Sequence, residues 1–129
     1  MAQAPIHILT ANVNSWRTMS TWALQRKEHI LLLQETRVTD DGIAGARRAA
    51  TEVGWSSAWS PAVPNRAGPA SGGLAVLCKG MRRMQMLPHP GTHASRWMHV
   101  VVETTAGNPL HIFTLYGYDK GQPEQPWSA

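Results

Sequence analysis

The stretch Ile30-Leu31-Leu32-Leu33-Gln34-Glu35-Thr36 decides how this chain folds. Its first four residues form a short continuous apolar run, which is typical of a strand buried on both faces of an α/β sheet. We expect the strand to span residues 30–34 and to leave Glu35 at its carboxyl-terminal edge. A strand of this type needs a neighbouring strand and helices that cover it, and the flanking sequence predicts both.

On the amino-terminal side, residues 6–14 are β-rich and end in residues that favour turns. Between residues 15 and 29, apolar side chains recur at steps of three and four, which predicts an amphipathic helix. On the carboxyl-terminal side, Asp40 and Asp41 are expected to cap a second helix that runs to Val53 and stops at Gly54. The order is therefore strand, helix, strand, helix.

After Gly54 the pattern changes to short strands separated by Pro- and Gly-rich connections. The predicted strands are 55–59, 73–78, 84–87, 97–104 and 110–116. Residues 106–109 are a plausible hairpin turn, and residues 119–129 have no helix or strand period and are expected to form a loop-like tail. We find no repeat and no interdomain linker, so residues 1–129 are interpreted as a single domain.

The amino-acid composition is that of a small folded domain with a positive net charge. The 129 residues are 43% hydrophobic and 16% charged, which suffices for one core and argues against a disordered charged tail. Twelve Lys and Arg against eight Asp and Glu give a net charge of +4. This balance favours phosphate-bearing partners, although dispersed positive residues are equally consistent with a solvated surface.

Cysteine usage and hydropathy bear on location. The lone Cys78 excludes an internal disulfide framework and a cysteine-based zinc site, and it favours a reducing compartment. No secretory signal pattern opens the sequence, and nowhere do eighteen apolar residues run together. We expect an intracellular protein, nuclear or cytoplasmic, without a membrane partner.

The candidate chemistry lies at two predicted strand ends. Asn12 ends the first strand and Glu35 follows the second, and ligands of open α/β sheets bind at the carboxyl ends of neighbouring strands. A carboxylate beside an amide suits Mg²⁺, which takes one or two protein carboxylates and fills its other positions with water and phosphate. The alternative is an asparagine that turns the chain and a glutamate on the surface.

The histidines and tryptophans are interpreted mainly as structural. His89 and His93 lie in a loop and are expected at the surface; His29 is expected to interact with a helix dipole. Three other histidines alternate with apolar residues and are expected on strand faces: His7, His99 and His111. Core packing is favoured for Trp22, Trp55 and Trp97, while Trp16 is left open between the core and base stacking.

Four segments in register resemble the endonuclease/exonuclease/phosphatase family, in particular its exonuclease III-like and retrotransposon endonuclease-like members. Residues 11–16, ANVNSW, are similar to the family's "WNVNG" opening, and residues 32–36, LLQET, to its "LQET" box. Residues 71–77, SGGLAVL, resemble its "GGVAIL" strand, and residues 113–118, FTLYGY, its strand ending in "VYVP". The resemblance extends from residue 6 to about residue 118.

This resemblance implies the amino-terminal half of a two-sheet α/β sandwich, with a mixed sheet flanked by two helices. It implies that Glu35 binds Mg²⁺ or Mn²⁺ and that Asn12 assists the metal or orients the phosphate. Tyr116 would direct its hydroxyl at the scissile phosphate, and Arg96 would approach the nucleic-acid backbone. DNA is the expected substrate class, and one sheet of the half-sandwich is expected to be uncovered unless a second chain covers it.

The sequence also departs from the family pattern. Ala11 replaces the opening tryptophan, and the proline expected after the tyrosine strand is absent around Gly117. The sequence contains no "DFN"-type box and no "SDH" box, which supply the groups that position and deprotonate the water. We therefore expect a truncated phosphodiesterase domain that is inactive alone and has an incomplete metal site. The alternatives are a non-catalytic basic binding module and a fragment of a phosphoinositide-type phosphatase.

Overall fold

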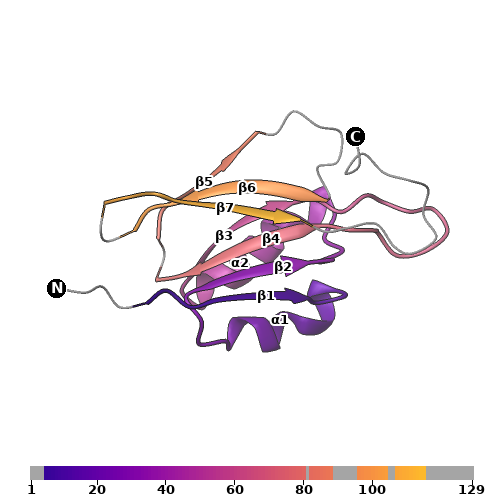
Figure 1. The fold of residues 1–129 in the computed structure, drawn as a ribbon. Helices are drawn as coiled ribbons and strands as arrows, with labels where there is room; N and C mark the ends of the chain where they lie inside the picture. Colours follow the sequence, from indigo (N-terminus) through magenta and orange to yellow (C-terminus); the bar gives the residue numbers. More distant parts are fainter. Residues whose placement is uncertain (1–4, 81, 89–95, 105–106, 116–129) are drawn as a thin grey trace.

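A computed structural model describes residues 5–80, 82–88, 96–104 and 107–115. Within these residues the chain forms two sheets and two α-helices (Figure 1). The four-stranded sheet has the order β1-β2-β4-β3 and consists of β1 (Ile8–Asn12), β2 (Ile30–Gln34), β3 (Trp55–Ser60) and β4 (Leu74–Lys79). The three-stranded sheet has the order β5-β6-β7 and consists of β5 (Met84–Leu87), β6 (Trp97–Val102) and β7 (Leu110–Leu115). The expected α/β class, with a mixed sheet and two helices, is confirmed.

The apolar run of β2 has the position that its sequence predicts. β2 pairs in parallel with β1 and antiparallel with β4, so it lies inside the sheet. Leu31 and Leu33 face the helix side, whereas Ile30 faces the second sheet, and all three are at most 1% exposed. Burial on both faces explains why this strand carries no alternation of apolar and polar residues.

Helix α1 (Trp16–Leu24) is shorter than the predicted amphipathic segment. The backbone amide of His29 donates to the carbonyl oxygen of His7 over 2.9 Å, which draws the chain into β2 soon after the helix ends. The Nδ1 atom of His29 accepts the backbone N–H of His7 at the same distance. The prediction that His29 interacts with a helix dipole is therefore wrong, because its Nδ1 atom binds the backbone of the residue that precedes β1.

Helix α2 (Ile43–Glu52) is preceded by a 3-10 turn, Asp40–Gly42. The predicted capping by Asp40 and Asp41 is wrong: both lie within the turn, and no side chain caps α2 at Gly42. The carboxylate of Asp41 instead accepts a hydrogen bond from the Thr39 hydroxyl. At the other end the prediction holds, since Gly54 follows the helix with a φ of +91°, a conformation that glycine adopts without a Cβ penalty.

The two helices cover one face of the four-stranded sheet and the three-stranded sheet covers the other (Figure 1). Buried residues from both sheets form the second layer of the core: Ile30, Ala58, Leu74, Val76, Cys78, Met98, Val100, Val102 and Ile112. The cover is incomplete at the edge strand β1, where Ile8, the register partner of Ile30, is 48% exposed. Exposed apolar surface also lies on the outer face of the three-stranded sheet, where Phe113 and Leu115 are 60% and 56% exposed.

The burial of the tryptophan side chains differs in part from the prediction. Trp55 is buried as predicted, and Trp16 is buried too, with its ring edge-on to Trp59 at a centroid distance of 5.1 Å. The core assignment of Trp22 is wrong, because this side chain is 36% exposed and carries the Arg26 guanidinium over its ring. Trp97 is half-buried. Among the described residues, no helix combines the length and the hydropathy needed to cross a membrane.

Candidate functional site

The parallel pairing of β1 and β2 sets the position of the candidate site. Asn12 and Gln34 are register partners at the carboxyl-terminal ends of the two strands, and Glu35 follows directly. Asn12 and Glu35 therefore lie at the same edge of the sheet, the edge at which ligands bind in open α/β folds.

The loop after β1 is held by backbone hydrogen bonds to β2 and to the segment that follows it. The Val13 amide donates to the carbonyl oxygen of Gln34 over 3.0 Å, and the Trp16 amide donates to that of Thr36 over 2.8 Å. Between these anchors, the side-chain oxygen of Asn12 accepts the Asn14 backbone N–H at 3.0 Å. Asn12 thus turns the chain, as the structural interpretation of this residue requires, and its exposed amide stays at the strand end.

The loop after β2 is fixed by the residues that precede β4. The Thr36 amide donates to the carbonyl oxygen of Gly73 over 3.1 Å, and the Arg37 amide donates to that of Gly72 over 2.9 Å. Thr36 is 1% exposed. Gly73 has a φ of +92°, and a Cβ built on it would lie 2.5 Å from the Thr36 hydroxyl oxygen. Only glycine fits this close approach of two backbone segments.

Backbone strain concentrates at this edge. Asn14, Glu35 and Arg37 have φ angles of +53°, +56° and +58°, in the left-handed region that side chains disfavour. Such conformations cost about 1–3 kcal/mol each and persist where the surroundings impose them. Strain of this kind clusters at functional sites, which marks the two loops as candidates independently of their sequence motif.

Arg37 connects the acidic and amide groups of the site. Its Nη2 atom lies 3.0 Å from Glu35 Oε1 and donates to Asn14 Oδ1 over 3.0 Å. Its Nη1 atom donates to the carbonyl oxygen of Ala70 over 3.2 Å. Sequence reasoning missed Arg37, although a basic residue two positions after the candidate ligand was a usable signal. The side chains of Glu35 and Arg37 are 16% and 26% exposed, so solvent still reaches both.

Of the other two predicted site residues, Arg96 and Tyr116, only Arg96 lies within the described part of the chain. Arg96 precedes β6, and its Nη2 atom donates to the Ser71 hydroxyl over 3.2 Å. Since Ser71 lies between Ala70 and Gly72, which both contact Arg37, Arg96 is at the same side of the molecule as Glu35. Tyr116 lies outside the described residues.

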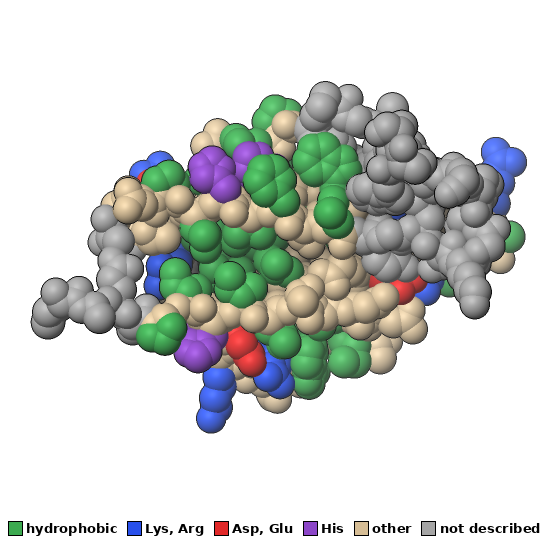
Figure 2. Space-filling view, in the orientation of Figure 1, with side chains coloured by type: hydrophobic (Ala, Val, Ile, Leu, Met, Phe, Trp, Pro, Cys, Tyr) green, Lys and Arg blue, Asp and Glu red, His purple; other side chains and the backbone are tan. Residues whose placement is uncertain are grey.

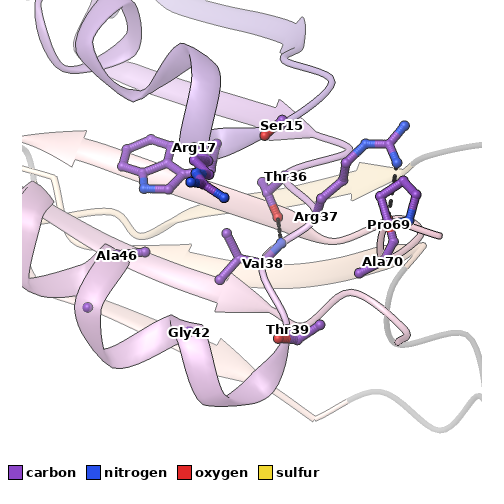
Figure 3. Close-up of a pocket in the computed structure, with 12 residues that line it drawn as sticks. Ser15, Arg17, Thr36, Arg37, Val38, Thr39, Gly42, Ala46, Pro69 and Ala70 are labelled. Carbon is purple, nitrogen blue, oxygen red and sulfur yellow. Dashed lines mark hydrogen bonds between the residues drawn. The ribbon is translucent and has the colours of Figure 1, made fainter. Parts of the chain in front are cut away.

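A pocket of about 740 Å³ opens beside these loops (Figure 3). It lies between the start of α1, the segment after β2 and the start of α2, and Arg17, Arg37 and Thr39 contribute polar groups to its lining. Arginine guanidinium groups are suited to phosphate and carboxylate ligands. The pocket and the Glu35 edge share Arg37, so one extended ligand could contact both.

The donor set permits only sparse metal coordination. Among the described residues, no three His, Cys, Asp or Glu side chains gather as a metal cluster. The edge offers the Glu35 carboxylate and the amide oxygens of Asn12 and Asn14. This set fits the lower limit for Mg²⁺, which binds through one or two carboxylates and keeps several waters. Arg37 competes for Glu35 Oε1, so metal binding there requires Arg37 to move or to share that oxygen.

Comparison with known proteins gives structural matches only. No family model matches the chain, and no curated protein matches it in sequence. A 3'-5' exonuclease from Neisseria meningitidis is 19% identical, with a TM-score of 0.58, over 84% of this chain and 40% of that one. An AP endonuclease from Leishmania major is 17% identical, with a TM-score of 0.55, over 89% of this chain and 40% of that one. The chain thus shares the fold of the matched part of these two proteins and spans about two-fifths of the length of each.

Proposed function

We propose that this chain is a nuclease-like phosphodiesterase domain that binds nucleic acid and Mg²⁺ or Mn²⁺ through Glu35 and Asn12. The observation that carries the proposal is the placement of Glu35 and Asn12 at one strained sheet edge, where Arg37 contacts Glu35, in a fold shared with two nucleases. Left-handed strain at Asn14, Glu35 and Arg37 lowers stability, and a ligand-binding role accounts for its retention at this edge.

Each side chain has a defined task in this proposal. Glu35 would hold the metal, and the amide of Asn12 would assist the metal or orient the phosphate. Arg37, once released from Glu35, presents its guanidinium to a phosphate oxygen, a geometry for which arginine is better suited than lysine. The metal, when bound, neutralises charge that develops on the phosphorus oxygens. Arg96 extends the proposed contact along the nucleic-acid backbone, and Tyr116, which lies outside the described residues, is proposed to direct its hydroxyl at the scissile phosphate.

Turnover needs groups that this sequence lacks. Hydrolysis requires a positioned water and a base that removes its proton, in addition to charge stabilisation. The boxes that would supply them do not occur in the 129 residues. We infer that the chain binds nucleic acid in an intracellular, nuclear or cytoplasmic setting but does not cleave it alone.

The test separates binding from cleavage. Nicking of supercoiled plasmid in Mg²⁺ measures cleavage, and fluorescence anisotropy of a labelled DNA duplex, with and without Mg²⁺, measures binding. We expect no nicking and an affinity that rises with Mg²⁺. Glu35→Gln should abolish the Mg²⁺-dependent part, because it removes the only carboxylate at the two strand ends within the described residues.

Glu28→Gln is the matched control. It changes the net charge by the same amount, but Glu28 is paired with Arg26 between α1 and β2, before the strand rather than after it. The control should retain the Mg²⁺ effect. If Glu35→Gln and Glu28→Gln bind identically, the metal proposal is wrong. Nicking that depends on Glu35 would instead overturn the inference of inactivity.

A second candidate, a non-catalytic phosphate-binding module, is favoured by one observation. Arg17 and Arg37 both line the pocket of about 740 Å³, and such a pocket can take an anion without a metal. This candidate predicts salt-sensitive DNA binding that is independent of Mg²⁺ and of Glu35. Arg17→Gln should weaken that binding by reducing the positive charge of the pocket.

A further inference from the structure

The outer face of the three-stranded sheet carries two histidines side by side. β6 and β7 pair so that His99 lies opposite Phe113 and Val101 lies opposite His111. His99 and His111 are therefore diagonal neighbours on one face, close enough for long side chains to meet. Figure 2 shows histidine side chains beside hydrophobic ones on this part of the surface.

The two imidazole rings meet through their nitrogens. His99 Nε2 lies 3.0 Å from His111 Nδ1, and the ring centroids are 5.2 Å apart. The His99 ring also stacks on Phe113, with a centroid distance of 4.0 Å and an interplanar angle of 21°. Phe113 thus covers one face of the His99 ring, while solvent reaches both histidines.

The nitrogen separation matches that of two ligands of one metal ion. Two nitrogens that each lie about 2.0–2.1 Å from an ion are about 2.9 Å apart at a right angle and about 3.3 Å apart at the tetrahedral angle. The observed 3.0 Å is within this range and close to the right-angle value. Adjacent ligands at right angles are typical of Cu²⁺ and Ni²⁺. An ion bound by both nitrogens lies off the line that joins them, so both rings must turn about χ2 to direct their lone pairs at it, and the broad χ2 torsion of histidine allows this.

We propose that His99 and His111 form a two-histidine site for a divalent transition-metal ion of the Cu²⁺ or Ni²⁺ type. Binding of the ion breaks the hydrogen bond between the facing nitrogens, and each of these nitrogens then directs a lone pair at the ion. The hydrogen of that bond leaves the donor ring, and the distal nitrogen of the same ring takes one up, so both imidazoles stay neutral with no net proton change. The described residues include no cluster of three such ligands, so water completes the coordination.

A second histidine pair shows what the site requires. His7 and His29 have ring centroids 5.6 Å apart, but the Nδ1 atom of His29 accepts the backbone N–H of His7 at 2.9 Å. That nitrogen is occupied by the main chain, so the hydrogen bond of this pair joins a backbone amide to a ring. The imidazoles are close together in both pairs, but the hydrogen bond of His99 and His111 joins two ring nitrogens.

Isothermal titration of the untagged 129-residue chain with Ni²⁺ tests the site. His89 and His93, which lie outside the described residues, are replaced by Gln in every sample so that they cannot bind the metal. We expect one Ni²⁺ per chain. His99→Ala and His111→Ala should each weaken Ni²⁺ binding by at least about tenfold, equal to 1.4 kcal/mol. The double variant should lose much less than a further tenfold relative to either single variant.

A control and a fixed background make the result specific. His7→Ala removes one imidazole of the other pair but keeps the backbone hydrogen bond to His29, so it should bind Ni²⁺ as the parent does. Every sample, the parent included, also carries Glu35→Gln, so that the proposed Mg²⁺ site does not add to the measured Ni²⁺ binding. Tryptophan fluorescence checks that each variant is folded, and His99→Asn and His111→Asn replace any alanine variant that is not.

A spectroscopic measurement gives an independent readout. The electron paramagnetic resonance spectrum of the Cu²⁺-loaded parent should show hyperfine structure from two imidazole nitrogens, and that of the His111 variant from fewer. The proposal is overturned if the parent binds no Ni²⁺ at about 1 mM, the weakest affinity of interest. It is equally overturned if the His99 and His111 variants bind like the parent, or if His7→Ala loses as much affinity as they do.

Discussion

Replacement of Gly73 by alanine adds only one methyl group but should strongly destabilise the folded chain. The φ of +92° at this position costs an alanine about 1–2 kcal/mol relative to glycine. The new Cβ would also lie 2.5 Å from the Thr36 hydroxyl oxygen and 3.2 Å from the Cβ of Ala62. Forcing a methyl group into such a packed place costs about 1–3 kcal/mol. We expect a total loss of about 2–5 kcal/mol in the free energy of unfolding.

Gly80 provides the matched control. Its φ is +82°, but nothing lies within 4 Å of a Cβ built on it. Gly80→Ala should therefore lose only the backbone part, about 1–2 kcal/mol. Urea unfolding followed by tryptophan fluorescence measures both variants, because Trp55 and Trp59 are buried in the fold. The difference between the two variants isolates the clash at Thr36.

A double variant tests the cause of the clash. Thr36→Ala removes the hydroxyl oxygen that the new methyl group would meet, so the combined variant with Gly73→Ala should lose less than the sum of the single losses. Contacting residues commonly show a coupling of about 0.5–3 kcal/mol. The reasoning is refuted if Gly73→Ala and Gly80→Ala differ by less than about 0.5 kcal/mol, which is the usual limit of additivity for independent sites.

Three further predictions concern other parts of the chain. Trp16→Ala should cost about 3–5 kcal/mol because the ring is buried, whereas Trp22→Ala should cost about 1 kcal/mol or less; urea unfolding compares them. Burial raises the pKa of the Cys78 thiol from 9.0 to about 12, so the folded state loses stability as the pH rises above about 9, and the urea midpoint should fall with pH less steeply in Cys78→Ala. The hydrogen bonds from Arg26, followed by a backbone hydrogen bond, lower the pKa of Glu28 from 4.5 to about 2, and a carboxyl NMR titration should find this pKa raised toward 4.5 in Arg26→Gln.

The sequence predicted the elements that local patterns determine. The strand at residues 30–34 was predicted with its observed bounds, because a continuous apolar run has few alternatives when it lies between polar residues. The end of α2 was predicted because Gly54 favours the left-handed conformation. The end of α1 was missed because the hydrogen bond from His29 to His7 joins residues that are distant in sequence, which no helical period can show.

The candidate site was predictable in part for the same reason. Strand order and register follow from the two strand patterns, so the neighbourhood of Asn12 and Glu35 could be inferred. The ion pair of Glu35 with Arg37 could not be inferred, because it depends on the left-handed conformations of both residues and on the hydrogen bonds from the Thr36 and Arg37 amides to the Gly73 and Gly72 carbonyls. The two-histidine pair also needs the register of β6 and β7, which alternation alone leaves undetermined.

The left-handed conformations of Glu35 and Arg37 have a consequence for laboratory evolution of this chain. Glycine adopts such angles without a Cβ clash, so a selection that rewards thermal resistance alone should enrich glycine at both positions. Each enriched clone would fold better and would lack a charged group of the proposed site. A stability screen would thus erase the site, and libraries built on this chain should hold these two codons constant.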